Sequence, residues 1–486
     1  MTIIGTQRKT KHNDEIFISF VDELASESVT GSMVYIETPK HKILLDAGFH
    51  QTNDLKNDYL ANTRRFLDFK PKDIDFIFLS HNHGDHIFEA PVLYKKGCTA
   101  TTFIPENTKG ILTAMMNDCL YINDRDAKWL REKYGKNYQP IFDEKDLNKF
   151  LNHTEESIIK RKIQIDEELS FQFIPSGHLK GGCQILLYIT IRNCTKKILY
   201  TGDLGNPLLP QPFTEKFEPV KKANIVIGES TYASKKDFKI DKKIRDFELE
   251  KLKNIIIEQV QEKKGKVIIP VFAQQRAQNI AYFIYEAFKK VKDFSYKVYI
   301  DSPLACEIFR LYNLSLSGKD KLLMEELMNW KNLEFIKEGL DSKALIESNE
   351  PCIILSSSGM CNHGRVKNHI KNIISDKNAT ILFCGYSADG TLASLLKDAS
   401  RNSIIIDSEE YEVCCNCYSF ITMSSHMPYD GLLNYYSNIH CEQIVLHHGN
   451  MDGKMEIRKD LKKEYEKQFK TTKIIISDKN TRLFIK

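Results

Sequence analysis

The sequence contains no apolar run that approaches the ~18 residues of a membrane-spanning helix. Its opening segment, MTIIGTQRKTKHNDE, lacks the succession of positive, apolar and small residues that marks a secretory leader. Internal repeats and low-complexity linkers are also missing. These absences exclude an integral membrane protein, favour a cytoplasmic location and indicate a chain that is folded throughout.

Net charge and paired cysteine motifs are scarce as well. The formal charge is +4 over 486 residues, so bulk charge neither requires nor excludes a polyanionic partner. Without a sign of export, the twelve cysteines are expected to be thiols. Cys414, Cys415 and Cys417 have no second pair at zinc-finger spacing, which favours half-buried strand thiols. A case for nucleic acid must therefore rest on a specific site.

The pattern of hydrophobic residues changes along the chain. Runs such as MVYIE, KILLD, FIFLS, ILLYITI and KILYTGD predict strands in about the first 200 residues. From about Lys242, FELEKLKNIIIEQVQEKKG predicts a helix, and VIIPVF, RAQNIAYFIYEAFKKV and VYIDSPLA continue an alternation of strand and helix. That alternation is typical of a parallel α/β unit. Short elements return after about Cys417, so we expect an α/β unit inserted into a strand-rich domain.

Four metal-binding side chains are concentrated in the segment LSHNHGDHIFEA, residues 79–90. They are His81, His83, Asp85 and His86, and the strand FIFLS leads directly into them. Imidazole nitrogens and carboxylate oxygens are suitable ligands for zinc and similar ions. A solvated polar turn is the alternative, and it does not account for the pattern HxHxDH.

Three further candidate ligands follow hydrophobic runs elsewhere. KILLDAG places Asp46 after a strand, PSGH places His178 after another, and YTGD places Asp203 after a third. Taken singly, such residues are more often found in turns or caps. Together with the histidine loop they indicate a shared metal site, because His and Asp side chains at separate strand ends can converge on one rim.

HNHGDH resembles the signature of the metallo-β-lactamase fold, an αββα sandwich with its site at one edge of two packed sheets. The resemblance implies two Zn²⁺ or similar divalent ions, with Asp46 supporting the ligands from behind. The implied ligands are His81, His83 and His178 on one ion, Asp85 and His86 on the other, and Asp203 between them.

Later segments resemble the motifs of β-CASP nucleases, a branch that includes prokaryotic β-CASP RNases and the pre-mRNA 3′-end cleavage endonuclease. They are IVIGESTYA with Glu229, FITMSSHMP with His426, and IVLHHGN with His447 and His448, each expected at the end of a strand. VIIPVFAQQRAQ, VYIDSPLA, SSSGMCNHGRV and CGYSADGTLA match the inserted domain, so the resemblance covers roughly residues 31–450. It implies that His448 completes the second metal site and that His426 is a general acid polarised by Glu229. His447 would point away, since neighbours on a strand face opposite sides.

The expected fold class is α/β, a metallo-β-lactamase αββα sandwich with an inserted β-CASP domain. The expected boundaries are 1–233 for the first part of the sandwich, 234–422 for the insert and 423–486 for the return. Met427 and Pro428 follow His426 where the family commonly has an acidic residue two places on. His363 and Gln275 occupy positions often held by glycine. These departures leave every proposed ligand intact and affect local loop shape.

The resemblance implies a zinc-dependent ribonuclease that cleaves RNA phosphodiester bonds by a two-metal mechanism and leaves a 5′-phosphate on the downstream product. The implied catalytic residues are Asp85, Asp203, Glu229 and His426. This chemistry requires an activated water and a proton for the departing oxygen. Ser357, Ser358 and Gly359 offer hydroxyls and bare backbone to a substrate phosphate.

Three alternatives remain open at this point. A DNA nuclease is disfavoured because the DNA-repair branch usually lacks the histidine found here as His448. A non-catalytic scaffold should have lost ligands, and none is lost. A small-molecule hydrolase does not require the long insertion. RNA is the expected partner, and a homodimer or protein partners are compatible with the sequence.

Overall fold

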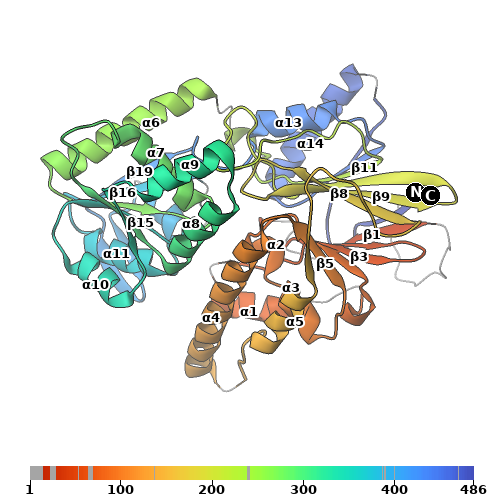
Figure 1. Ribbon diagram of the computed structural model, residues 1–486, viewed down its shortest axis with the longest axis horizontal. Helices are drawn as coiled ribbons and strands as arrows, with labels where there is room; N and C mark the ends of the chain where they lie inside the picture. The colour runs from red at the N-terminus through yellow and green to blue at the C-terminus, as the bar shows by residue number, and fades with distance from the viewer. Residues whose placement is uncertain are drawn as a thin grey trace.

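The computed structural model describes residues 15–21, 29–52, 54–63, 69–135, 137–237, 241–385, 387, 390–398, 400–468 and 470–486. In Figure 1, two packed sheets and the helices that cover them form one side of the molecule. A separate lobe that contains a third sheet forms the other side. Within the described ranges, no helix combines the length and apolar character needed to cross a membrane.

Two seven-stranded sheets form the sandwich. In order, the first contains β22 (Arg482–Ile485), β1 (Ile16–Phe20), β2 (Val34–Glu37), β3 (Lys42–Leu45), β4 (Phe76–Phe78), β5 (Thr101–Pro105) and β6 (Thr154–Ser157). The second contains β21 (Lys473–Ile476), β20 (Gln443–Leu446), β11 (Ile225–Gly228), β10 (Cys194–Tyr200), β9 (Cys183–Ile191), β8 (Leu169–Pro175) and β7 (Ile163–Gln164).

Alternating side chains hold the four layers of the sandwich together. In β3, Ile43 and Leu45 face the second sheet, whereas Leu44 faces the helices outside the first. Those helices include α1 (Leu55–Thr63), α3 (Ala90–Lys95), α4 (Lys109–Tyr134) and α5 (Glu144–Asn152). Helices α13 (Tyr429–Asn438) and α14 (Met451–Lys467) cover the second sheet. The predicted αββα arrangement is therefore present.

The third sheet lies in the lobe drawn in green and cyan in Figure 1. Its order is β14 (Leu333–Ile336), β13 (Lys297–Asp301), β15 (Cys352–Ser356), β12 (Val267–Pro270), β16 (Thr380–Cys384) and β19 (Asn416–Phe420). All neighbours are parallel. Such strands are buried on both faces, which explains continuous apolar runs such as CIILS.

Helices cover both faces of the third sheet. They are α6 (Lys242–Ile257), α7 (Arg276–Phe288), α8 (Pro303–Ser315), α9 (Gly318–Met328), α10 (Gly339–Glu347), α11 (Arg365–Ile373) and α12 (Leu392–Leu396). The hairpin of β17 (Ser403–Ile406) and β18 (Glu409–Glu412) completes this part. The helix predicted from FELEKLKNIIIEQVQEKKG is present as α6, in which Leu252 and Ile256 are buried.

The chain leaves the sandwich after β11 and returns to it at β20. These strands are parallel neighbours, with Ile225 opposite Gln443. All six strands of the third sheet lie between them in the sequence. The boundaries at residues 233 and 423 stay a prediction.

Two local features differ from the sequence-based expectation. Helix α4 spans 26 residues in a region expected to be rich in strands. His426 does not directly follow a strand, because β19 ends at Phe420 and belongs to the third sheet. The proposed acid therefore lies on the connection between that sheet and α13.

Tyr386, Ala388 and Asp389 of the CGYSADGTLA motif lie outside the described residues. All twelve cysteines are free thiols, as expected.

Candidate metal centre and active site

The histidine loop begins where β4 ends and runs into α2 (Gly84–Ile87). Contacts at Nδ1 orient two of its imidazoles. His81 Nδ1 lies 3.0 Å from Ser80 Oγ, and His86 Nδ1 lies 2.7 Å from Asp46 Oδ2. Each Nε2 is thereby left for another contact.

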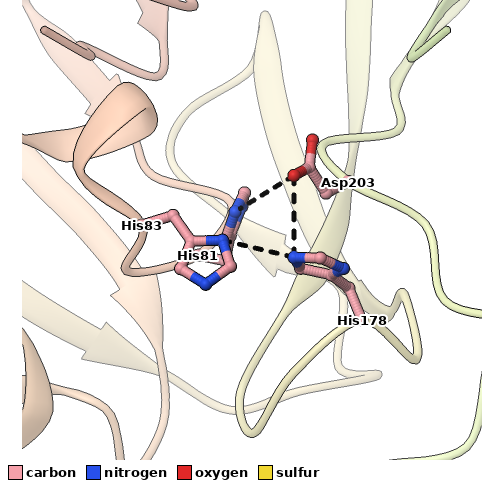
Figure 2. Close-up of side chains that lie close together, drawn as sticks. All are labelled: His81, His83, His178 and Asp203. Atoms are coloured by element: carbon pink, nitrogen blue, oxygen red, sulfur yellow. Dashed lines mark hydrogen bonds and ion pairs between the residues drawn. The ribbon is translucent and has the colours of Figure 1, made fainter. Parts of the chain in front are cut away.

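The first cluster is shown in Figure 2 and contains His81, His83, His178 and Asp203, whose candidate ligand atoms all lie within 4.8 Å of one another. His81 Nε2 and His178 Nε2 each lie 3.6 Å from Asp203 Oδ2. His178 Nε2 lies 3.3 Å from His83 Nδ1. Tetrahedral ligands about 2 Å from an ion are roughly 3.3 Å apart, so these spacings fit a single ion.

A second cluster contains Asp85, His86 and His448. His86 Nε2 and His448 Nε2 lie 3.3 Å and 3.6 Å from Asp203 Oδ1. The two oxygens of Asp203 therefore face different clusters. This is the arrangement required of a carboxylate that bridges two ions.

Burial of the donor atoms and the neutral state of several imidazoles also suit a metal, whereas the carboxylates of Asp203, Asp85 and Asp46 raise the pKa of His86. His81 Nε2, His86 Nε2, His448 Nε2 and Asp203 Oδ1 are buried without a hydrogen-bond partner among the described residues. Burial lowers the pKa of His83 and of His448 to about 3, which keeps both imidazoles neutral. Neutral imidazole is the form that binds metals, so the donor set fits divalent cations.

Asp46 is the centre of a hydrogen-bond network that holds His86 of the second cluster in position. It has a left-handed backbone with φ 58°. Its Oδ1 accepts from Ser80 N at 2.7 Å, and its Oδ2 accepts from Ser80 Oγ and Tyr200 OH, both at 2.7 Å. Burial raises the pKa of Tyr200, so its hydroxyl stays a donor. Sequence reasoning missed Ser80 and Tyr200, although both stand directly beside the quoted ligand motifs.

Replacing Asp46 by asparagine tests this support. The amide keeps the size of the side chain but loses the charge that fixes His86. Metal affinity is expected to fall by roughly 10–100-fold, the usual effect of losing a partner behind a ligand. Titration of metal into chelator-treated protein measures it, with Tyr200→Phe as the milder comparison. Unchanged affinity in Asp46→Asn would contradict the assignment.

Glu229 and His426 lie beside the first cluster. Glu229 Oε1 accepts from Leu204 N at 2.9 Å and Oε2 from Thr231 N at 2.8 Å, so the carboxylate is fixed. His426 Nδ1 lies 4.0 Å from Glu229 Oε1 and 3.9 Å from Asp203 Oδ2. Burial alone would lower the pKa of His426, but these carboxylates raise it above its ordinary value. The arrangement favours a protonated imidazole.

His447 is separate from both clusters. Its Nδ1 lies 3.0 Å from Ser477 Oγ, and its Nε2 lies 3.4 Å from Ser32 Oγ. The neighbouring His448 has φ 46°, which turns its side chain toward Asp203. His447 thus has a packing role, as the alternation of strand faces suggested.

Comparison with known families agrees with both parts of this architecture. Residues 28–102 match the metallo-beta-lactamase superfamily, and residues 277–396 match the Beta-Casp domain. The chain therefore contains a metallo-beta-lactamase domain and a Beta-Casp domain. The metallo-beta-lactamase superfamily implies divalent metal binding, in agreement with the two clusters.

Several β-CASP relatives extend over most of the chain. It is 26% identical to Ribonuclease TTHA0252 of Thermus thermophilus, over 90% of this chain and 94% of that protein. It is 29% identical to an RNase J-like protein of Methanocaldococcus jannaschii, over 86% and 89% respectively. It is 24% identical to Cleavage and polyadenylation specificity factor 73 of Drosophila melanogaster, over 94% of this chain and 63% of that protein.

A solved structure shares the fold. A protein of unknown function from Enterococcus faecalis superposes with a TM-score of 0.54 at 13% identity, covering 97% of this chain and 100% of its own. At that identity the likeness concerns the fold alone.

The β-CASP domain brings part of the serine and glycine cluster close to the metal centre. A Cβ on Gly359 would lie 3.0 Å from the ring of Phe272, so a larger residue here would have to displace that ring. The Phe272 ring centroid lies 6.4 Å from that of His83. Ser358 Oγ donates within its own loop to His363 O at 3.4 Å. Ser357 Oγ is buried without a partner among the described residues.

Gln275 fixes the β-CASP domain against the metal-site loops. It has φ 67°, the conformation that suits the glycine commonly found there. Its Oε1 accepts from Lys180 N at 3.1 Å, near the loop of His178, and from Tyr312 OH at 2.8 Å in α8. Its Nε2 donates to Pro212 O at 2.8 Å and to Thr214 Oγ1 at 2.7 Å. These bonds compensate for the strained backbone and join both parts of the protein.

Proposed function

We propose that this chain is a zinc-dependent ribonuclease that hydrolyses RNA phosphodiester bonds at a two-metal site. The observation that carries this proposal is a complete set of donors in two clusters that share one carboxylate. The proposed ligands are His81, His83, Asp85, His86, His178, Asp203 and His448. The names of the relatives support RNA as the substrate.

Two ions held by these ligands would supply an acidified water molecule and neutralise charge on the phosphoryl oxygens. The protein's own residues would do the rest. Asp46 orients His86, and Asp203 sets the spacing of the two clusters. His426, kept protonated by its carboxylate neighbours, would donate a proton to the departing 3′ oxygen. The phosphate then remains as a 5′-phosphate on the downstream fragment.

The function is tested with protein purified without chelators. Elemental analysis should find about two divalent ions per chain, with zinc predominating, because three- and four-ligand His and Asp sites suit that metal. Single-stranded RNA should be cut, removal of metal should stop cleavage, and zinc should restore it. The downstream product should be a substrate for a 5′-monophosphate-dependent exonuclease.

A single-stranded DNA of the same sequence serves as the matched substrate. Equal cleavage of DNA and RNA would contradict a ribonuclease, and cleavage by metal-free protein would contradict the metal mechanism. A 5′-hydroxyl on the downstream product would refute the assigned direction of bond breakage.

A further inference from the structure

A buried arginine of the β-CASP domain lies within electrostatic range of the metal centre. Arg276 begins α7 and is only 7% exposed. Its Nη1 has no hydrogen-bond partner among the described residues. Burial lowers its pKa, and the groups that oppose this effect most are Tyr232 and Cys384, neither of which is a carboxylate. An isolated buried cation is costly, so an anionic partner is expected from outside the chain.

A second cation, Lys397, contacts the backbone segment that passes against Arg276. A Cβ on Gly385 would lie 3.0 Å from Arg276 Cζ, so the chain passes directly against the guanidinium. Lys397 Nζ donates to the carbonyl of Gly385 at 2.9 Å. Burial lowers the pKa of Lys397 too, and the cysteines Cys384 and Cys361 are the groups that raise it. Among the described residues, the groups that favour these two positive charges most are therefore thiols and a tyrosine, and not carboxylates.

An aromatic ring lies between these cations and the metal ligands. Phe272, Arg276, Gly359 and Ser387 line one small hollow. Phe272 is 36% exposed, although its ring centroid lies 6.4 Å from that of His83. The charge of Arg276 also contributes to lowering the pKa of His83, behind the larger effect of burial. The hollow is thus within electrostatic range of the metal centre.

We infer that Arg276, with Lys397 behind it, binds a backbone phosphate of the RNA strand on the β-CASP side of the metal centre, and that Phe272 stacks against an adjacent base. This subsite rests on the proposed ribonuclease activity. A guanidinium suits phosphate because its planar donors form paired charge-assisted hydrogen bonds. An exposed ring beside a cation is the arrangement found where proteins hold single strands without reading their sequence.

The subsite is tested by RNA binding, separately from cleavage. Metal-loaded His426→Ala protein is used as the parent, and a short fluorescent 2′-O-methyl oligoribonucleotide as the probe. Arg276→Met should weaken binding roughly tenfold or more, the scale of a lost charged hydrogen bond. The slope of log Kd against log salt should fall by about 0.7, the value for one phosphate contact on a single strand.

Three further variants separate binding from a structural role. Arg276→Lys should keep the salt slope, because it keeps the charge. Phe272→Leu should weaken binding severalfold with the slope unchanged, since stacking is not ionic. Arg310→Met is the matched control, because the exposed Arg310 side chain is ion-paired with Glu307 on α8. It should bind as the parent does.

Unfolding temperature and metal content are measured for every variant. Arg276→Met should unfold no earlier than the parent, since an unpaired buried charge has been removed. If it binds RNA with the parent's affinity and salt slope, or loses stability and metal with the slope unchanged, the subsite is refuted and the ribonuclease proposal stands. A parent that does not bind the probe would overturn both.

Discussion

Asp203→Ala is expected to lose both metal ions and nearly all RNA cleavage. Asp203 faces both clusters, with Oδ2 3.6 Å from His81 Nε2 and Oδ1 3.3 Å from His86 Nε2. Its removal deprives each ion of a ligand and of a neutralising charge. Metal ions contribute several kcal/mol to such reactions, so activity should fall by roughly a thousandfold or more. Elemental analysis and single-turnover cleavage measure the two effects.

Asp203→Asn refines this result, because an amide has one oxygen where the carboxylate has two. It should weaken binding of one ion more than the other. Asp398→Ala is the control, since Asp398 pairs with Arg401 at an exposed position. An Asp203→Ala variant that retained two ions would show that the carboxylate does not bridge them.

His426→Ala is expected to keep both ions and to slow RNA cleavage by roughly a hundredfold or more, the usual scale for a positioned proton donor. The imidazole lies beside the first cluster, while the ligand set is complete without it. A substrate whose leaving oxygen departs without a proton should restore much of the rate. Glu229→Gln should have a milder effect of the same kind, because it removes one charge that favours the protonated imidazole.

His448→Ala is the informative comparison for His426→Ala. His448 Nε2 lies 3.6 Å from both Asp85 Oδ2 and Asp203 Oδ1, so its loss should weaken the second metal site together with activity. The better leaving group should not rescue it. If His426→Ala lost an ion, or cleaved ordinary RNA at the wild-type rate, the proposed division of roles would be wrong.

The positions of the candidate ligands follow from local sequence, because each stands in or near the loop at a strand end. Asp46, His81 and Glu229 follow runs whose apolar character marks the strand and whose polar residue marks its end. Neighbouring strand ends meet at one edge of a sheet, which brings such residues together. Sequence alone could therefore suggest the metal centre from particular motifs.

Other parts of the site depend on contacts between distant segments. Gln275 is joined to Lys180 and Pro212, and nothing in the local pattern predicts those partners. Arg276 stands in a predicted helix, and the absence of a hydrogen-bond partner for its Nη1 among the described residues is visible only in three dimensions. Helix α4 is a different case. Its buried residues, from Ile111 to Leu130, recur at three- and four-residue spacing, so closer attention to periodicity would have found it.

The pairing of β11 with β20 has a consequence for the order in which the protein matures on the ribosome. Ile225 cannot pair with Gln443 until Gln443 has been synthesised, which is about 200 residues and therefore roughly 10 s or more later. The third sheet is contiguous in the chain and can form during this interval, but His448 follows only after β20. A growing chain thus holds most metal donors while its second metal site is unfinished. The proposed second metal site therefore cannot be complete until synthesis of the chain is nearly finished.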